Sequence, residues 1–214
     1  AVQATPEADL RLARQGYYAM VSEVDYHVGR ILRCLEETGL AKTTAVIFTS
    51  DHGEWLGEHG RYGKGYPGCD AVSRVPLLMR WPRDIAPVGA PSAGRVVHRI
   101  VEAVDVVPTL LEGAGIPIPP HLQGRSLFVE PEGDASGGGA LMEETGWKSL
   151  RVPGYRYIAH ADGRELLFDL TRDPGEYRDL ALDPASAPVL ADLRLRLLRR
   201  LIERERPRPR CWPY

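Results

Sequence analysis

Cysteine is scarce in this chain, and it has neither a long apolar run nor an excess of one charge. Three cysteines among 214 residues are too few and too scattered for a disulfide framework or a CxxC-type zinc site. No apolar run approaches the roughly 18 residues of a spanning helix, so we expect no membrane segment. A net charge of −2 offers no general attraction for nucleic acid. The first residues, AVQATPEADLRLARQ, carry neither Met nor a targeting pattern and are typical of an internal start.

The first half of the chain predicts a helix followed by a buried strand. Apolar residues between Leu10 and Leu35 recur at steps of three and four, the period of an amphipathic helix, and Gly39 is a suitable end. The run AVIF predicts a strand covered on both faces, and Val75–Trp81 predicts another. A helix feeding a buried strand favours an α/β fold on an open, mostly parallel sheet with flanking helices.

The second half predicts a smaller α+β subdomain after a Gly-rich linker. YRYIAH and ELLFDL flank the turn ADGR and predict a hairpin, and a terminal helix is expected from about Ala187 to Glu205. Eight arginines between Arg194 and Arg210 alternate with leucines, which favours a solvated helix face over a nucleic-acid or lipid surface. The predicted division is an α/β part, a linker, the subdomain and a tail, at residues 1–130, 131–139, 140–206 and 207–214.

A carboxylate and an imidazole follow one another at the end of the first predicted strand. Ligands of open α/β sheets lie beyond the carboxyl ends of strands, so Asp51 and His52 are candidate metal ligands on a rigid support. The alternative is a turn-forming Asp beside a structural His. Lys64, between two glycines of the following loop, either places a positive charge on an anionic ester oxygen or is a solvated surface lysine.

Several ordered blocks of the sequence carry a further signal, and together they cover most of residues 15–200. They read YYAMVSEVDYHVGRILRCLEETGL, TTAVIFTSDHGEWLGEHGRYGKG, SRVPLLMRWP, VDVVPTLLEGAGIPIP, LQGRSL and YRYIAHADGRELLFDLTRDPGEYRDL. These blocks resemble the C-terminal half of a type I sulfatase of the alkaline phosphatase superfamily. The resemblance implies the C-terminal part of the sulfatase catalytic α/β domain and a sulfate ester as substrate. Relatives with a similar SDHG segment act on phosphorus esters, so a phosphonate monoester or phosphodiester hydrolase is the alternative.

The resemblance also assigns roles to single residues. Sulfatases hold one divalent cation, usually Ca²⁺ with Mg²⁺ as the alternative, and its ligands include the positions occupied here by Asp51 and His52. Lys64 matches the lysine that binds the sulfate group. His59 resembles a loop position close to the substrate, and a turn-stabilising role is its alternative. Structural roles are expected for Asp25 and His27, and Asp105 is expected to cap the helix that follows it.

The nucleophile of the family is not identifiable in this sequence. Sulfatases use a formylglycine aldehyde made from Cys or Ser in a C-x-P/A-x-R motif. Cys69 begins CDAVSR, but Arg74 stands one position too far along, so Cys69 is not expected to react. The resemblance therefore predicts a C-terminal fragment that is inactive alone, with formylglycine only in an N-terminal half, which would be its partner polypeptide. A catalytically silent remnant acting as an interaction module is the alternative from another class, and a Zn-dependent phosphatase is less favoured.

Overall fold

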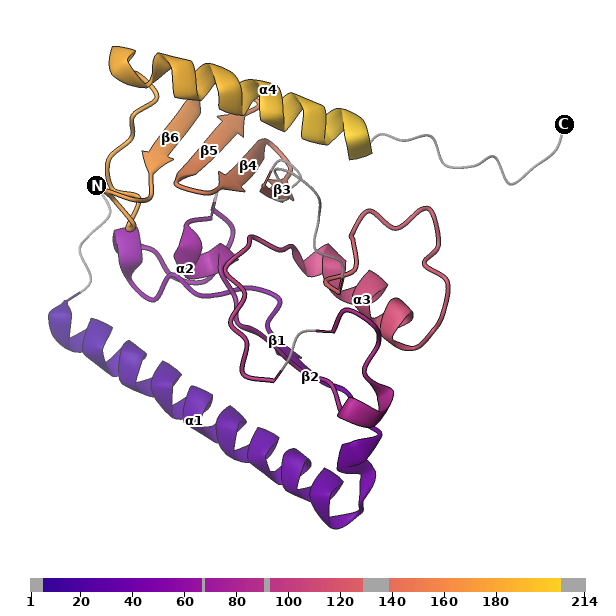
Figure 1. Cartoon of the computed structure of the whole chain (residues 1–214). Coiled ribbons are helices and arrows are strands. Elements are labelled where there is room, and N and C mark those ends of the chain that lie inside the picture. The colour runs from indigo at the N-terminus through magenta and orange to yellow at the C-terminus, as the bar shows by residue number, and fades with distance from the viewer. Residues whose placement is uncertain (1–5, 67, 91–92, 129–138, 205–214) are drawn as a thin grey trace, which may run out of the picture. The chain divides into compact units, whose positions relative to one another are not determined.

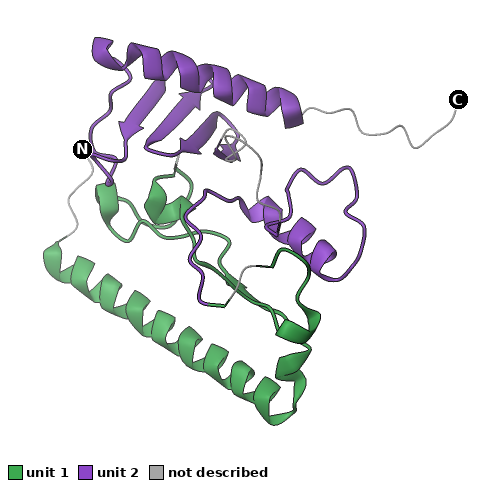
Figure 2. Ribbon diagram, in the orientation of Figure 1, with its two compact units in different colours: residues 1–93 green, residues 94–214 purple. Residues whose placement is uncertain are grey.

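The computed structural model describes residues 6–66, 68–90, 93–128 and 139–204. The chain forms two compact units, residues 1–93 and 94–214 (Figure 2). Helices and sheets occur together, as expected for an α/β chain (Figure 1). None of the helices among the described residues is both long and apolar enough to cross a membrane.

The first unit is dominated by one long helix, as the apolar period predicts. Helix α1 begins after Pro6, carries acidic residues in its first turn, and ends before Gly39, whose φ of 75° suits a helix stop. The elements of this unit are α1 (Glu7–Glu37), η1 (Leu40–Lys42), β1 (Val46–Thr49), η2 (Glu58–Gly60), α2 (Asp70–Ser73), β2 (Leu77–Arg80) and η3 (Arg83–Ile85).

The apolar side chains of α1 are largely exposed. None of its residues is buried, and Met20 and Ile31 of the apolar stripe keep 58% and 62% of their surface accessible. An apolar helical stripe of this kind normally faces a core. Other residues of this stripe, such as Leu32 and Leu35, are half-buried, so the described residues cover this face of α1 only in part.

The pairing of the two strands differs from the prediction. Strands β1 and β2 pair antiparallel, with Val46 opposite Arg80 and Thr49 opposite Leu77, so the parallel arrangement is not found among the described strands. The expected cover on both faces is also wrong here, because Phe48 and Leu78 are 38% and 59% exposed. A continuous apolar run indicates a strand but specifies neither its direction nor its neighbours, which explains the difference.

The second unit contains an antiparallel meander covered by a helix. Strands pair in the order β3-β4-β5-β6, and the predicted hairpin is confirmed as β5 and β6. The predicted terminal helix is confirmed as α4, whose Leu193 packs with Leu150 and Leu167 of the sheet. The elements are η4 (Ala103–Asp105), α3 (Val106–Gly113), β3 (Ala140–Glu144), β4 (Trp147–Val152), β5 (Tyr155–His160), β6 (Glu165–Asp169), η5 (Pro184–Ser186) and α4 (Ala187–Arg204).

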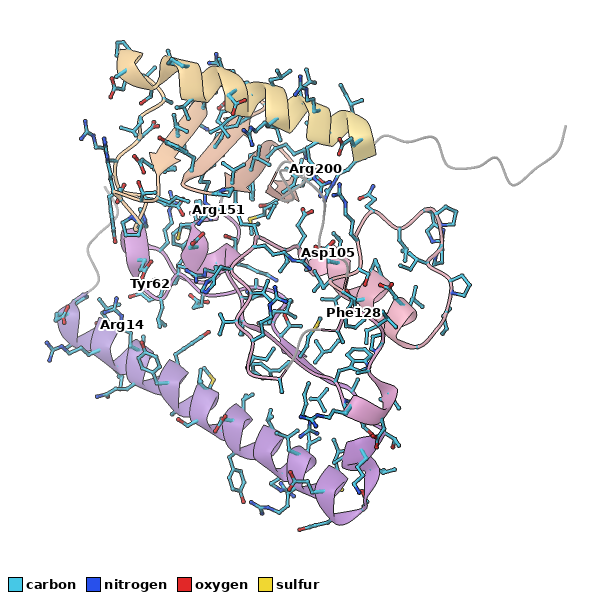
Figure 3. The ribbon with its side chains drawn as sticks, in the orientation of Figure 1. Arg14, Tyr62, Asp105, Phe128, Arg151 and Arg200 are labelled. Atoms are coloured by element: carbon cyan, nitrogen blue, oxygen red, sulfur yellow. The ribbon has the colours of Figure 1, made fainter. Side chains whose placement is uncertain are left out.

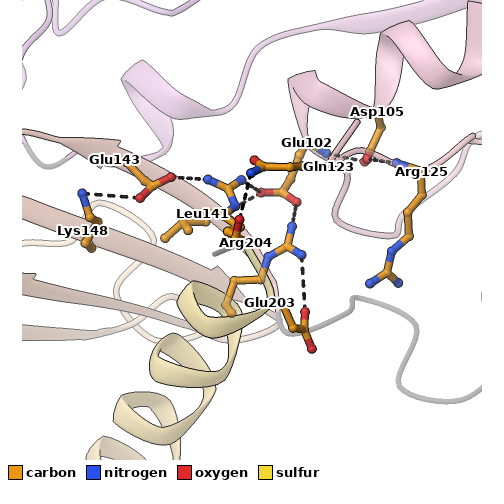
Figure 4. A network of polar contacts seen from close by, with 10 residues as sticks. Glu102, Asp105, Gln123, Arg125, Leu141, Glu143, Lys148, Glu203 and Arg204 are labelled. Carbon is orange, nitrogen blue, oxygen red and sulfur yellow. Dashed lines mark hydrogen bonds and ion pairs between the residues drawn. The ribbon is translucent and has the colours of Figure 1, made fainter. Parts of the chain in front are cut away.

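An ionic network joins η4 to the meander and to α4. The Glu102 carboxylate accepts the Leu141 N–H at 2.9 Å and contacts the guanidinium groups of Arg200 and Arg204 (Figure 4). Arg204 also pairs with Glu143. Because Arg200 is buried, removing Glu102 would leave a desolvated cation, so this network fixes the helical segment against the subdomain.

Asp105 directly precedes α3, but its side chain does not cap that helix as the sequence predicts. Its carboxylate accepts the Glu102 N–H at 2.9 Å within a capping box and the Arg125 N–H at 2.8 Å. The predicted linker, Gly139 excepted, and the predicted tail lie outside the described residues, and the domain boundaries stay a prediction.

Candidate functional site

The candidate site begins where β1 ends. The hydroxyl of Ser50 donates to the His52 carbonyl at 2.9 Å, and the Gly53 N–H donates to the Val72 carbonyl at 2.8 Å. These bonds turn the chain away from the strand and attach it to α2. Residues 53–66 then form the loop that contains the other candidates.

Gly53 approaches the backbone of α2 too closely for any side chain. A Cβ atom at this position would lie 2.0 Å from the Ala71 carbonyl oxygen and 3.0 Å from its carbon. The obstacle is backbone, which moves less readily than the end of a side chain. The glycine is therefore required for the contact that positions Asp51 and His52.

Replacing Gly53 with alanine is expected to lower the free energy of unfolding by about 1–3 kcal/mol, because the methyl group must push two backbone segments apart. Urea denaturation followed by circular dichroism would measure it. The matched control is Gly29→Ala in α1, where a Cβ meets nothing within 4 Å and helix propensity favours alanine. Equal stability of Gly53→Ala and the parent chain would contradict the close approach.

Asp51 and His52 form a compact pair of potential metal ligands. Asp51 Oδ2 lies 3.5 Å from His52 Nε2, and Asp51 Oδ1 accepts the His52 backbone N–H at 3.0 Å. His52 Nδ1 lies 2.7 Å from the Gly53 carbonyl oxygen, which can only accept. Nδ1 therefore carries the proton, and the lone pair of a neutral ring is on Nε2, facing the carboxylate.

The charge state of Asp51 suits a cation. The hydrogen bond from the His52 N–H is the main cause that holds the pKa of Asp51 below its ordinary value. The positive charge of Lys64 also lowers this pKa, and desolvation opposes both effects. The exposed carboxylate is thus ionised at neutral pH.

The donor set fits a divalent cation only in part. At metal–ligand distances of about 2.3–2.6 Å, two atoms 3.5 Å apart are neighbouring ligands at roughly a right angle. A carboxylate suits Ca²⁺ or Mg²⁺, whereas an imidazole is a more typical ligand of transition metals. Within the described part of the chain no group of three or more His, Cys, Asp and Glu could hold a metal ion, so any cation bound here needs further ligands.

Lys64 is exposed in the loop, between Gly63 at a φ of 73° and Gly65 at 104°. Its charge acts on the Asp51 carboxyl, since it is among the causes that lower the pKa of that group. The positive φ values of both neighbours favour glycine, which explains the G-K-G pattern. The charge of Lys64 is therefore near enough to stabilise the ionised form of Asp51.

His59 lies against an aromatic ring in the same loop. It adopts a φ of 52° within the turn Glu58–Gly60, and its ring meets that of Trp55 edge to face, with centroids 5.4 Å apart. This contact supports the turn-stabilising alternative, and a substrate contact of His59 stays a prediction. Asp25 and His27 lie on exposed positions of α1.

The loop is braced by residues that the sequence analysis did not select. The Glu54 carboxylate accepts the N–H groups of Leu56, at 3.2 Å, and Gly63. Arg14 of α1 donates to the Leu56 carbonyl at 3.3 Å; Figure 3 labels Arg14 together with Tyr62 of the loop. Arg61 lies over the rings of Trp55 and Tyr66. The sequence feature that could have identified these residues is the presence of aromatic residues between closely spaced glycines.

Cys69 is a poor candidate for a nucleophile in the structure as well. It is buried directly before α2, and its carbonyl accepts the N–H groups of Val72 and Ser73, both at 3.0 Å. Neither Cys69 nor the exposed Cys34 forms a disulfide among the described residues. A buried thiol of this kind packs as a small apolar group.

Comparison with known proteins places this geometry in context. A family model described as Sulfatase matches residues 2–116. Arylsulfatase K of Mus musculus is 35% identical over 208 residues, which cover 89% of this chain and 36% of that protein. The chain thus spans little more than a third of the length of the curated relatives it matches.

Two solved structures share the fold over most of the chain. One is the phosphonate monoester hydrolase of Agrobacterium radiobacter, with a TM-score of 0.80 and 32% identity, covering 92% of this chain and 42% of that one. The other was solved in complex with its substrate D-glucosamine-2-N,6-O-disulfate; its TM-score is 0.77 and its identity 28%, with 90% and 41% coverage. The α/β class is confirmed by this likeness.

Proposed function

The chain belongs to the sulfatase family of the alkaline phosphatase superfamily, and on that basis we propose that it supplies two metal ligands and one sulfate contact for the hydrolysis of a sulfate ester. The observation that carries the proposal is the Asp51–His52 pair at the end of β1, together with the charge of Lys64 acting on the same carboxylate. A carboxylate, an imidazole and an ammonium that share one region suit a cation and an anionic ester.

Lys64 is proposed to bind a sulfuryl oxygen. A lysine ammonium is a point charge with three donors, and it gains most where negative charge grows on the ester during reaction. The exposed position and the two flanking glycines leave its side chain room to reach a ligand. His59 is retained as a proposed substrate contact, although its packing on Trp55 supports the structural alternative.

Asp51 and His52 are proposed to hold a divalent cation, Ca²⁺ before Mg²⁺. When bound, the cation neutralises charge on the ester and orients it. Asp51 would offer its ionised carboxylate, and His52 would offer Nε2, because its Nδ1 donates to the Gly53 carbonyl. The Asp51 carboxylate is the harder donor of the two and would make the stronger contribution to Ca²⁺ binding.

The nucleophile is proposed to come from a part of a sulfatase domain other than the described residues. No C-x-P/A-x-R motif occurs in the sequence, and Cys69 is buried. The exposed apolar side chains on one face of α1, which include Met20, Val24 and Ile31, are the kind of surface that such a part would cover. The chain by itself is therefore proposed to be inactive.

A phosphonate monoester or phosphodiester is the second candidate substrate. It is favoured by the structural likeness to the phosphonate monoester hydrolase, whose TM-score is 0.80. Sulfate and phosphonate esters place similar anionic oxygens around the reacting atom, so a lysine and a cation serve both. The third candidate function is that of a catalytically silent interaction module. In that case Asp51 and Lys64 would have no chemical role.

Calcium titration of the isolated chain by calorimetry tests the proposed site. We expect weak binding, with a dissociation constant of about 10⁻⁴ M or above, because two ligands leave a hard cation largely hydrated. Asp51→Asn is expected to abolish it, whereas the control Asp25→Asn, on exposed α1, is expected to leave it unchanged. Tight binding that survives Asp51→Asn would place the cation elsewhere.

The same preparation is expected to show no hydrolysis of an aryl sulfate or a phosphonate monoester, even with Ca²⁺ and a formylglycine-generating enzyme, because it has no modifiable motif. Turnover that disappears in Cys69→Ser would show that this thiol is the nucleophile after all and would overturn the proposal. Turnover that persists in Cys69→Ser would also contradict it.

A further inference from the structure

Arg61 is held in place by the backbone of its loop. Its N–H donates to the Glu58 carbonyl at 2.9 Å, and its carbonyl accepts the Gly57 N–H at 2.8 Å. The Trp55 N–H bonds the Gly63 carbonyl at 3.2 Å, which closes the turn around it. The backbone at Arg61 is thus fixed on both sides, unlike that of a residue in an unbraced surface loop.

The side chain of Arg61 is held as well. Its guanidinium carbon lies 4.0 Å from the centroid of the Tyr66 ring and 5.2 Å from that of Trp55. The two rings lie 6.5 Å apart and nearly perpendicular, and Trp55 is buried. Two aromatic contacts of this kind restrict a planar cation and reduce the entropy lost when it binds a ligand.

The guanidinium has no polar partner among the described residues. Its contacts there are the two aromatic rings, and no hydrogen bond or ion pair to another described residue engages its side-chain N–H groups. In the second unit, by contrast, arginines such as Arg194 use their N–H groups in ion pairs, here with Glu165. Ring stacking uses the faces of a guanidinium and leaves the N–H donors at its edge available for an oxyanion.

Arg61 is also close to the proposed sulfate contact. It precedes Lys64 by three residues, so their Cα atoms are at most roughly 11 Å apart even in a fully extended chain. The closed turn brings them nearer than this limit. One loop therefore presents two cations, the exposed ammonium of Lys64 and the guanidinium of Arg61, which contacts two aromatic rings.

We propose that Arg61 is a specificity-determining residue, whose guanidinium binds a second oxyanion on the same substrate whose sulfate group contacts Lys64. This inference rests on the function proposed above and names its substrate class: sulfate esters that carry a neighbouring carboxylate or a second sulfate group. A guanidinium binds either group through two parallel N–H donors.

Matched aryl probes test this inference without requiring turnover. Phenyl sulfate carries one oxyanion, the three carboxyphenyl sulfate isomers add a carboxylate, and the three benzene disulfates add a second sulfate. The chain is titrated with each probe while the amide resonances of Gly63 and Gly65 are followed by NMR. At least one two-charge probe is expected to bind roughly tenfold more tightly than phenyl sulfate, because a charge-assisted bidentate contact is added.

Arg61→Gln is expected to remove this preference, measured within the variant as the ratio of its affinities for the two-charge probe and for phenyl sulfate. Arg61→Lys, which keeps the charge but not the fork of donors, is expected to lose most of it, and this variant replaces Arg61→Gln if the latter unfolds. Arg33→Gln on α1, where Arg33 is exposed, removes the same charge outside the loop and should preserve the preference. If the carboxyphenyl sulfates bind more tightly than the benzene disulfates, the second oxyanion is a carboxylate. The opposite order identifies it as a sulfate group.

The outcomes separate this inference from the proposed function. Equal affinity for all probes, or a preference that survives Arg61→Gln and Arg61→Lys, overturns the role of Arg61 and leaves the sulfate site standing. Phenyl sulfate binding that is insensitive to Lys64→Ala overturns the proposed function itself. No saturable binding of any probe overturns both.

Discussion

Lys64→Ala is expected to lower kcat/KM for a sulfate ester by roughly a hundredfold or more, in an enzyme that combines this chain with a nucleophile-bearing sulfatase segment. The ammonium would contact a sulfuryl oxygen on which charge grows in the transition state. Losing such a contact reduces kcat as well as substrate affinity. The expected result is therefore a fall in both, measured by steady-state kinetics over a range of ester concentrations.

The variant is expected to fold normally, because Lys64 is an exposed loop residue that packs little. Lys42→Ala, which removes an exposed lysine from η1, is the matched control and should keep full activity. Lys64→Arg keeps the charge in a different shape and should recover part of the rate. Unchanged kinetics in Lys64→Ala would show that Lys64 is a solvated surface residue and does not belong to the site.

The largest stability effect is expected at a buried ion pair of the second unit. Arg156 of β5 and Glu176 are 1% and 4% exposed, and Arg156 Nε lies 3.0 and 2.9 Å from the two carboxylate oxygens. Arg156 also donates to Ser149 Oγ at 3.3 Å. Glu176 holds a φ of 59°, an uncommon value for a non-glycine residue, so its backbone conformation depends on such contacts.

Glu176→Ala is expected to lower the free energy of unfolding by about 3–5 kcal/mol, because it leaves a buried guanidinium without its counter-charge. The double variant Arg156→Met with Glu176→Leu removes both charges and should recover much of this loss. Urea denaturation of the parent chain, Glu176→Ala and the double variant would measure the three free energies of unfolding.

A surface pair provides the control for this experiment. Asp162 and Arg164 are joined at 2.7 Å in the β5–β6 turn but remain exposed. Asp162→Ala should therefore change stability little, since exposed ion pairs contribute little. A loss at Glu176 no larger than that at Asp162 would contradict the burial of the pair, as would a double variant that is less stable than Glu176→Ala.

The sequence alone determined the elements that depend on local pattern. The period of α1, the hairpin turn between β5 and β6 and the leucine repeat of α4 are properties of neighbouring residues, so they could be predicted. The family could also be inferred, because ordered blocks such as SDHG and LLFDL keep their spacing along the chain. The candidates Asp51, His52 and Lys64 came from those blocks, and their roles stay predictions.

Tertiary structure decided what depends on contacts between distant residues. The antiparallel direction of β1 and β2 depends on which edges meet, and an apolar run does not encode this. The close approach of Gly53 to Ala71, the stacking of Arg61 on two rings and the burial of Arg156 with Glu176 all join residues that no local pattern links. The same arginine type is solvated at one position and enclosed at another, because packing sets the surroundings of a charge.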